Sequence, residues 1–537
     1  MIIQRLTLLA ATLAAVSPCA AVAQRPRDPA TLTIAIAREP TSPIPTLWRN
    51  DVANIDVSDL MFLRLADLGP EVTTIGDKGF VPRLAKQWTR RDPVTLAFDL
   101  DPRAHWQDGK PVTSADVLLG FERARNPRIT PQIATLLRRI KDVKAEGANR
   151  VVVTFTEPYP EQLYDATYQA LPLPAHLLAG IPAESLGTSS FAAAPVGSGP
   201  YRFVRRVPGQ LIELAADTTF FLGRPRVNRL IFLLASDPEA RANLLLDGTA
   251  DAVDNIYSFT NPARLERLPA FQYYPVPGLL LAYIGINQRD PADTSRPHPI
   301  LGDRAVRQAL VLAADRKVIG QAQYGPMTTS PGAPLSPVLR RNLDAPSSPP
   351  YDPARAAKLL ESAGWTDHDG DGIRDKNGRP LRLKMIVPAP VPARVVMGTR
   401  VQEGYRKLGI DLALEVEEGG VYTTRRNAGQ FDLDFAGARQ DPTPSGLTQS
   451  WTCAGIGGSN VIHYCNPAVD SLIRRAGVSV TGASGLYHQA LQRIADDYPA
   501  VFMAAVVSTF AVNRRFENIR IPPTSPWSAV WQWGVKR

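Results

Sequence analysis

The sequence predicts an α/β protein of several domains, and three observations support this fold class. Segments with strand-like alternation take turns along the chain with amphipathic segments that carry helix caps. Between residues 352 and 416 these signals follow the order helix, strand, helix, strand, which is the pattern of a doubly wound lobe. The chain has 537 residues, 44% of them hydrophobic and 21% charged. This size allows about three or four domains' worth of core.

The first predicted elements come from short local patterns. Residues 32–37 alternate apolar and small polar side chains, which predicts a strand. Thr113, with Asp116 three residues later, predicts the capped start of a helix. Asp303 predicts the start of another helix, with an apolar face within residues 306–313.

The alternation of helices and strands is clearest after residue 350. Asp352 as N-cap, Pro353 at the first helical position and Gly364 as the stop predict a helix. A strand, a helix and a strand are expected next, at residues 381–387, 395–408 and 410–416. Because no long Gly/Ser linker separates the lobes, we expect the chain to pass between them through paired strands. Such strands would form a hinge that lets the lobes close around a ligand.

The first 23 residues have the layout of a secretory signal peptide. Arg5 precedes an apolar run at residues 6–16, and Ala21-Val22-Ala23 offers the small side chains of a cleavage site. The run is shorter than the roughly 20 residues that span a bilayer. A buried N-terminal helix and a lipoprotein cysteine at Cys19 are the alternatives. We expect cleavage after residue 23 and export of a soluble mature chain.

Export would place the remaining cysteines in an oxidising compartment. Cys453 and Cys465 are the only two left after cleavage, and in an oxidising compartment they can form one intramolecular disulfide. Two free buried thiols are the alternative. A zinc site is less favoured, because the six histidines are scattered and no CxxC or HExxH occurs. We therefore predict the disulfide.

Charge and missing motifs exclude several classes of function. The net charge of +9 comes from 60 basic and 51 acidic residues that are mixed along the chain, so nucleic acid is not an expected partner. The sequence has no GxGxxG after a strand, no GxxxxGK[ST] and no GxSxG. The stretch Gly197-Ser198-Gly199-Pro200 is interpreted as a rigid turn rather than as a nucleophile turn. We expect no catalytic residue and no cofactor.

One acidic loop has the spacing of a calcium site. Asp367, Asp369, Asp371 and Asp375 stand at positions 1, 3, 5 and 9 of such a loop, with glycine at position 6. Position 12, where a bidentate glutamate is needed, holds Gly378, and a strand rather than a helix is expected to follow. An acidic turn is therefore the alternative to a structural calcium site of low affinity.

Five further segments match the patterns of one protein family, in the expected order along the mature chain. They are WQDGKPVTSADV at 106–117, PVGSGPY at 195–201, LDGTAD at 246–251, DRAVRQAL at 303–310 and NPAVDSLI at 466–473. On these segments the chain resembles the extracytoplasmic solute-binding proteins of family 5. Members of that family deliver peptides, and in some cases nickel or sugars, to ABC importers.

The resemblance implies a fold and its division into domains. We expect the two-lobed periplasmic binding protein fold (class II, large peptide-binding type) with an extra inserted domain and a hinged interlobe cleft. The signal peptide at 1–23 would be followed by a first lobe at 24–60, 196–283 and 506–537, an inserted domain at 61–195 and a second lobe at 284–505. Strands near 280–287 and 502–512 would cross between the lobes.

The resemblance also implies an anchor for a ligand amine. In peptide-binding relatives, an aspartate after a strand of the second lobe grips the ligand's α-ammonium. Counting from Phe431-Asp432 places Asp441 at that position, although Ala438 stands where an aromatic residue is usual. Because Pro442 follows directly, Asp441 is alternatively a turn cap.

Three further residues are candidates for contact with the ligand. Arg439 would hold a ligand carboxylate or neutralise Asp441. Asn54 lies in the loop after the first strand, where relatives line the cleft, and a plain surface loop is the alternative. Trp451 is either a cleft aromatic or a core residue.

These expectations combine into one function. The chain would be a periplasmic, monomeric binding protein that captures short peptides between its lobes and docks on permease subunits in the inner membrane. Another solute, such as a nickel chelate, an opine or an oligosaccharide, is the alternative within the family. A secreted peptidase is the alternative outside it, and a chaperone or signalling receptor using the same cleft is a third.

Overall fold

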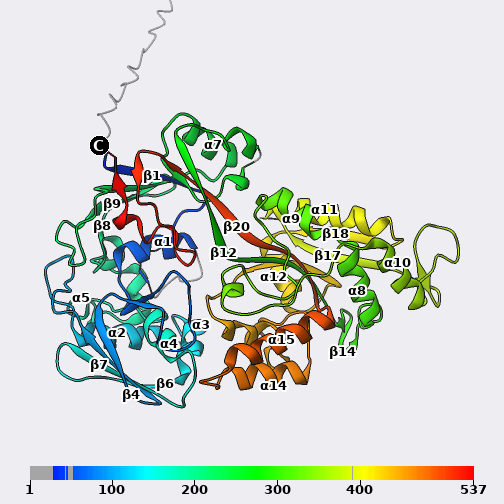
Figure 1. Ribbon diagram of the computed structural model, residues 1–537, viewed down its shortest axis with the longest axis horizontal. Helices are drawn as coiled ribbons and strands as arrows, with labels where there is room; N and C mark the ends of the chain where they lie inside the picture. Colours follow the sequence, from blue (N-terminus) through cyan, green and yellow to red (C-terminus); the bar gives the residue numbers. More distant parts are fainter. Residues whose placement is uncertain are drawn as a thin grey trace, which may run out of the picture.

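The computed structural model describes residues 28–40, 42, 44–45, 52–259, 261–389 and 391–536. The predicted signal peptide at residues 1–23, with Cys19, lies outside the described residues. The described chain forms two bodies that are joined by two long strands, β12 (Phe271–Ile286) and β20 (Ala500–Asn513) (Figure 1). The predicted α/β, two-lobed architecture is confirmed.

A ten-stranded sheet runs through both bodies in the order β18-β17-β19-β12-β20-β11-β1-β10-β9-β8. The bounds of its shorter strands are β1 Thr31–Ile36, β8 Tyr201–Val207, β9 Leu211–Ala216, β10 Arg229–Leu234, β11 Ala252–Val253, β17 Arg382–Pro388, β18 Asp411–Glu417 and β19 Leu433–Arg439. β12 and β20 pair antiparallel, with register shifts between Pro277 and Leu281 and between Ala282 and Tyr283. The first shift separates the part of β12 near β11 from the part that pairs with β19. The strand expected at 502–512 is part of the longer β20, and the one expected at 280–287 overlaps the last residues of β12, which ends at Ile286.

The first body contains the strands β1 and β8–β11, which we call the first lobe, and a smaller region that we call the inserted domain. The inserted domain has a four-stranded antiparallel sheet in the order β4-β5-β7-β6. The elements of this body are α1 Val52–Met61, β4 Ala85–Asp92, β5 Thr95–Leu100, α2 Ser114–Ala124, α3 Pro131–Leu136, β6 Ile140–Ala145, β7 Arg150–Phe155, α4 Gln162–Tyr168, α5 Ala175–Leu178, α6 Ser190–Ala193 and α7 Pro238–Leu246. One hydrophobic cluster extends from Leu32 in β1 to Phe98 in β5 and Leu163 in α4. The two parts of this body therefore share a core.

The second body, which we call the second lobe, covers β17–β19 with helices on both faces. Its helices are α8 Arg304–Ala313, α9 Arg316–Tyr324, α10 Pro353–Ser362, α11 Pro392–Arg406, α12 Gly419–Asn427, α13 Leu447–Ser450, α14 Pro467–Ala476 and α15 Ala483–Asp497. Met385 packs in the cluster that includes Leu310 of α8, whereas its neighbour Ile386 packs in the cluster that includes Leu491 of α15. Neighbouring residues of β17 thus face opposite cores, as expected of a strand that is buried on both sides.

The local predictions hold in detail. The strand predicted at 32–37 is β1, and the three predicted after residue 380 are β17, α11 and β18. The Thr113 N–H donates to Asp116 (2.7 Å), and the side chains of Asp303 and Asp352 accept from the first turns of α8 and α10. α11 begins earlier than predicted, at residue 392, because a proline fits the first helical position.

Two of the family-like segments pack against each other. The Gln107 side chain accepts from the Gly197 N–H (3.0 Å) and donates to the Gly199 carbonyl (3.0 Å). A Cβ atom at Gly197 would lie 1.9 Å from the carbonyl oxygen of Met61 at the end of α1, so only glycine fits there. The Ser198 hydroxyl is buried and accepts from the Leu63 N–H (3.2 Å). The stretch 197–200 is therefore a packed turn, as predicted.

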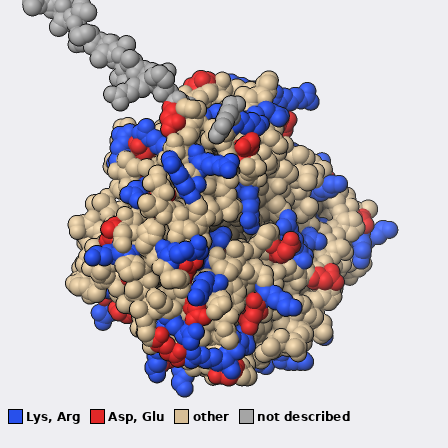
Figure 2. Space-filling model, turned by 60° about the vertical axis from the view of Figure 1, so that its left-hand side comes forward, with Lys and Arg blue, Asp and Glu red and all other residues tan. Residues whose placement is uncertain are grey.

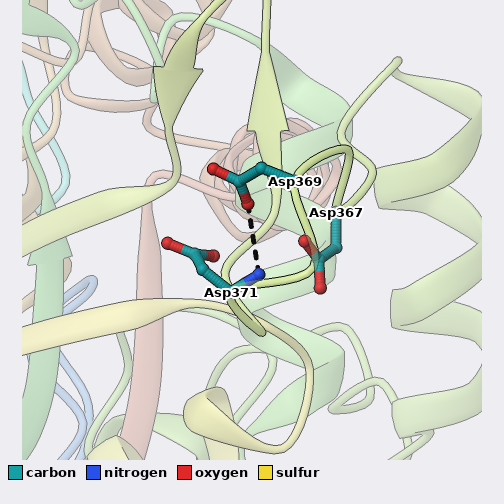
Figure 3. A group of neighbouring side chains, drawn as sticks. All are labelled: Asp367, Asp369 and Asp371. Atoms are coloured by element: carbon teal, nitrogen blue, oxygen red, sulfur yellow. Dashed lines mark hydrogen bonds between the residues drawn. The ribbon is translucent and has the colours of Figure 1, made fainter.

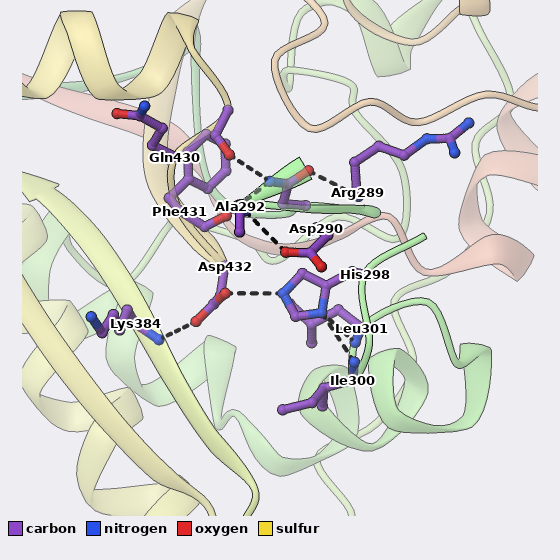
Figure 4. Close-up of polar contacts among 12 residues, drawn as sticks. Arg289, Asp290, Ala292, His298, Ile300, Leu301, Lys384, Gln430, Phe431 and Asp432 are labelled. Carbon is purple, nitrogen blue, oxygen red and sulfur yellow. Dashed lines mark hydrogen bonds and ion pairs between the residues drawn. The ribbon is translucent and has the colours of Figure 1, made fainter. Parts of the chain in front are cut away.

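A buried histidine is held at the start of β19 by an aspartate that also bonds to β17 (Figure 4). Asp432 accepts from the backbone N–H of Lys384 in β17 (2.7 Å), and its other oxygen lies 3.0 Å from His298 Nε2. His298 Nδ1 accepts from the N–H groups of Ile300 (3.1 Å) and Leu301 (2.9 Å), so Nε2 carries the proton and donates it to Asp432. This network fixes the segment before α8 to the start of β19 and to β17.

Four two-stranded pairs complete the described elements. They are β2 Ala66–Leu68 with β3 Phe80–Pro82, β13 Arg289–Asp290 with β14 Asp293–Pro297, β15 Asp375–Lys376 with β16 Arg379–Pro380, and β21 Phe516–Glu517 with β22 Gly534–Val535. Acidic and basic side chains are interspersed over the face seen in Figure 2. Within the described ranges, every helix is too short or too polar to span a membrane.

Candidate ligand-binding site

β19 ends at Arg439 in the second lobe, and the chain turns there. β19 pairs with β17 on one side and with β12 on the other. The next residue, Gln440, is held at three points. Its N–H donates to the Leu279 carbonyl (2.9 Å), its side-chain oxygen accepts from the Ser336 N–H (2.6 Å), and its side-chain nitrogen donates to the Pro334 carbonyl (2.7 Å). These bonds place the neighbouring side chains of Arg439 and Asp441 at the end of the strand.

A cavity of about 140 Å³, which we call the β19 cavity, opens beside this turn. Arg439, Asp441 and Trp451, three of the four predicted ligand-binding residues, line it together. Tyr283 of β12 lines it as well, and its ring lies 5.7 Å from that of Trp451. The cavity therefore combines one cation, one anion and two aromatic rings at the place where the long crossing strands meet the second lobe.

Asp441 is exposed in this structure, at the rim of the β19 cavity. It lies close enough to Asp165 of the inserted domain that its charge contributes to the raised pKa of that carboxyl. Asp441 thus stands between the second lobe and the inserted domain.

Arg439 reaches from the second lobe toward the first. Its guanidinium donates to the carbonyl of Thr524 in the C-terminal segment. Burial and the charge of Asp59 raise the pKa of Asp56 in α1 well above its usual value, and the charge of Arg439 opposes that rise. Arg439 therefore brings positive charge to a part of the first lobe that holds a buried carboxyl.

Trp451 is mainly a core residue with one side on the β19 cavity. Its side chain is 4% exposed and packs against Phe502 (5.5 Å between ring centres) and Tyr464 (6.5 Å) in the second lobe. Trp451 was predicted to be either a cleft aromatic or a core residue. Its ring packs in the core, and one side of it lines the β19 cavity.

Asn54 lies apart from the other three candidates. It is in α1, is 3% exposed, and its side-chain oxygen accepts from the Ser42 N–H (3.1 Å). It is not among the residues that line the β19 cavity. The described contact gives Asn54 a part in holding the segment after β1 rather than in touching this cavity.

A disulfide secures the wall behind Trp451. Cys453 and Cys465 are bonded, with an S–S distance of 2.08 Å. The N–H of Cys453 also donates to both oxygens of Asp470 in α14 (3.1 Å each). The segment that follows Trp451 is thus tied to the start of α14.

The inserted domain supplies an opposing wall that the sequence analysis missed. Glu161 and Asp165, at and inside the start of α4, face the second lobe, and the Thr443 hydroxyl donates to Glu161. Burial raises the pKa of Glu161 to about 8, with the charge of Asp165 adding to the rise. Burial also raises the pKa of Asp165 to about 7, although the Tyr159 hydroxyl donates to it (2.8 Å).

A larger cavity of about 440 Å³ lies between these carboxyls and the second lobe. It is lined by Glu161, Asp165 and Arg139 from the inserted domain and by Asp470 from α14. Gln449 lines both this cavity and the β19 cavity, so the two are neighbours. The sequence did contain a signal for this wall, because Glu161 and Asp165 stand four residues apart in the otherwise apolar and aromatic stretch 159–168.

A carboxyl of the first lobe was also missed. Asp254 follows β11, and its side chain is exposed although the surrounding protein raises its pKa by desolvation, with Arg241 opposing the rise. Its charge also contributes to the raised pKa of Asp56. Asp254 lies just beyond the family-like segment at 246–251, and the fold places it near Asp56.

The acidic loop is a separate, exposed feature (Figure 3). Oxygens of Asp367, Asp369 and Asp371 lie within 4.8 Å of one another. Asp367 accepts from the N–H groups of Gly370 (2.7 Å) and Gly372 (3.0 Å), whereas Asp375 pairs with His368 (3.0 Å). Asp375 is not part of the group, and the bonds within the loop are those of an acidic turn. We assign no metal to it.

Known proteins resemble the chain over most of its length. The model "Bacterial extracellular solute-binding proteins, family 5 Middle" matches residues 79–458. A putative ABC transporter peptide-binding protein of Brucella ovis is 29% identical over 397 residues, covering 72% of this chain and 70% of that protein. The structure of the oligopeptide-binding protein AppA from Bacillus subtilis, in complex with a nonapeptide, has a TM-score of 0.76 at 23% identity and covers 94% of this chain and 99% of that one. NikZ from Campylobacter jejuni, in complex with Ni(L-His), has a TM-score of 0.75 at 25% identity, with the same coverage.

Proposed function

The chain belongs to the bacterial extracellular solute-binding proteins of family 5, and we propose that it is the substrate-binding component of an ABC importer. It captures short peptides in the cleft between its lobes and delivers them to permease subunits in the inner membrane. The names of the Brucella and Bacillus relatives, which are peptide-binding proteins, support a peptide as the solute.

The observation that carries the proposal is the β19 cavity, which has Asp441 and Arg439 on its wall. A peptide at neutral pH carries one ammonium and one carboxylate, and each would find its opposite charge there. A charge-assisted hydrogen bond of this kind contributes about 1.5–3 kcal/mol. Binding needs no covalent step, and closure of the lobes would shift an existing equilibrium between open and closed forms.

We propose the domain division at 24–60, 61–195, 196–283, 284–505 and 506–537 for the mature protein. The boundaries at 283 and 505 fall inside β12 and β20, the strands that both lobes share. We also propose that residues 1–23 are a signal peptide that directs a monomer to the periplasm. The description of the family as extracellular supports export.

The test has two steps on the full mature chain. Native mass spectrometry of freshly purified protein would identify any cargo that is carried through purification. Calorimetry with di- and tripeptides of alanine then compares the wild type with Asp441→Asn. We expect a loss of affinity of about 10- to 100-fold, because the neutral amide no longer pairs with the ammonium.

Controls make the result specific. Asp369→Asn changes an exposed aspartate of the acidic loop and is expected to leave affinity unchanged. N-acetylated peptides lack the ammonium and should bind the wild type and Asp441→Asn equally weakly. Equal affinity of both proteins for the free peptides would refute the anchor, and recovery of cleaved peptides would favour a peptidase.

A metal chelate is the second candidate for the solute. The likeness to NikZ in complex with Ni(L-His) favours it. Nickel titrated with histidine in the same calorimeter separates this candidate from the peptide, because a chelate without an α-ammonium would lose little affinity in Asp441→Asn.

A further inference from the structure

A cavity of about 250 Å³, which we call the arginine cavity, lies where the first lobe, the inserted domain and the second lobe meet. Four arginines line it, each from a different segment. Arg64 follows α1, Arg83 follows β3, Arg341 belongs to the second lobe and Arg520 to the C-terminal segment. No sequence motif singles out these four residues, so only the fold brings them together.

The positive charge of the arginine cavity exceeds its negative charge. Arg83 pairs with Asp67 (2.6 Å) and Arg64 with Asp59 (2.9 Å), and these are the acidic residues on its wall. Arg341 and Arg520 form no ion pair with any residue that the structure describes. Among the residues that the structure describes, these two guanidinium groups therefore have no counter-charge at the cavity.

Arg64 adds an unusual donor to this wall. It is 5% exposed, and its guanidinium lies 4.5 Å above the ring of Tyr168. Its Nε is buried and has no hydrogen-bond partner within the described ranges. A buried donor without an acceptor costs free energy, which an acceptor in or beside the cavity would recover.

Apart from apolar residues such as Phe62 and Trp531, the wall includes polar side chains that suit a small oxygen-rich group. Ser525, Ser528 and Thr524 bring hydroxyl groups, and Gln532 brings an amide. Guanidinium forks match the planar oxygens of carboxylates and phosphates. We infer that the arginine cavity is a binding site for an oxyanion, either a carboxylate or a phosphate group.

The position of the cavity gives such an anion a structural consequence. Pro275, Val276 and Pro277 of β12, next to the register shift, form part of the wall. Beside Arg341, the Asn342 side chain donates to the Glu71 carbonyl (3.0 Å), which joins the second lobe to the inserted domain. An anion held by Arg341 and Arg520 would therefore link the second lobe to the first at the crossing strands.

The cavity also adjoins the proposed peptide site. Thr524 lines the arginine cavity, and its carbonyl accepts from Arg439, which lines the β19 cavity. The oxyanion has two possible sources, a free phosphate ion or the carboxylate of the captured ligand. The inference does not rest on the proposed function, because the charge surplus exists whichever solute the protein carries.

Calorimetry with inorganic phosphate at constant ionic strength tests the site in the full mature protein. We expect the double variant Arg341→Gln, Arg520→Gln to bind phosphate at least about tenfold more weakly than the wild type. Both residues are exposed, so the variant is expected to fold. The matched control, Arg379→Gln with Arg400→Gln, removes two exposed arginines elsewhere and should leave binding unchanged, whereas Arg341→Lys with Arg520→Lys should retain part of it.

A second arm identifies the source of the oxyanion. Tripeptides with a free carboxylate are compared with their C-terminal amides, with and without phosphate. If the wild type prefers the peptide acid over its amide, this preference disappears in the Gln double variant and phosphate competes with the acid, the site is assigned to the ligand's carboxylate. The site is assigned to the free phosphate ion if the double variant loses phosphate binding but the peptide acid and its amide bind equally. The same assignment follows if phosphate binding is lost and no peptide binds at all. If neither phosphate binding nor a preference for the acid depends on Arg341 and Arg520, the inference is wrong.

Discussion

The two walls of the β19 cavity and its neighbour are built on different physical principles. The second-lobe wall is an aromatic cluster of Trp451, Tyr283 and Phe502, backed by a disulfide. The inserted-domain wall is polar, and its centre is formed by two carboxyls, the buried Glu161 and the half-buried Asp165. Packing contacts are numerous and independent of pH, whereas a buried carboxyl has an energy that depends on its proton.

The difference separates a fixed wall from an adjustable one. Glu161 contacts the second lobe through the Thr443 hydroxyl, and Arg139 contacts it through the Gly477 carbonyl (2.9 Å). Each of these two contacts is a polar bond across the boundary between the domains. We therefore expect substitutions in the second-lobe wall to change global stability, and substitutions in the inserted-domain wall to change the pH dependence of the contact between domains.

Trp451→Ala is the strongest test of the fixed wall. Removing a buried tryptophan from a packed cluster leaves a void, and we expect the free energy of unfolding to fall by about 3–5 kcal/mol. Chemical denaturation followed by circular dichroism measures it. Trp451→Phe, which refills part of the space, should lose clearly less. A loss below about 1 kcal/mol in the alanine variant would show that the wall is not tightly packed.

Replacing both Cys453 and Cys465 by serine should have the next largest effect. The bond closes a loop with a sequence separation of 12 residues. For a loop of this size the chain-entropy model gives a loss of about 3 kcal/mol. Thermal unfolding of the variant should match that of the wild type under reducing conditions. An unchanged melting temperature in both would mean that the bond adds nothing to the wall.

Glu161→Gln should have the smallest effect on stability and the clearest effect on pH dependence. Since burial raises the pKa of Glu161 to about 8 and that of Asp165 to about 7, the folded protein holds these protons more tightly than the unfolded chain. The two protonated carboxyls contribute fully to the free energy of unfolding below the pKa values of the unfolded chain, near pH 4. This contribution is lost as the pH rises through about 7 and 8. The wild-type melting temperature should therefore fall over this range.

The variant isolates one of these two groups. Glu161→Gln cannot ionise, so its melting temperature should fall less between pH 5 and pH 8.5 than that of the wild type. Glu184→Gln, an exposed glutamate of the same domain, is the matched control and should behave like the wild type. If Glu161→Gln and the wild type show the same pH profile, the inserted-domain wall is not the adjustable one.

Sequence patterns predicted the fold well where the determinants are local. The caps at Asp303 and Asp352 and the alternation in residues 381–387 act within one or two turns of chain, so they survive any tertiary arrangement. The site was predictable in part, because the family resemblance pointed to Asp441, and the separately named candidates Arg439 and Trp451 line the same cavity. Glu161, Asp165 and Tyr283 were missed, because they reach the cavities through contacts between segments that are far apart in sequence. Asn54 was expected at the cleft by the same resemblance, but its side chain is engaged with Ser42.

β20 makes both lobes depend on one strand. It follows almost all of the other described elements along the chain, yet it lies in the middle of the main sheet and pairs with β12 and β11. A premature stop codon shortly before codon 500 would spare nearly every other element and still remove the strand from both lobes at once. The truncated product would be expected to lose both halves and to be cleared by proteases rather than to survive as a shorter receptor.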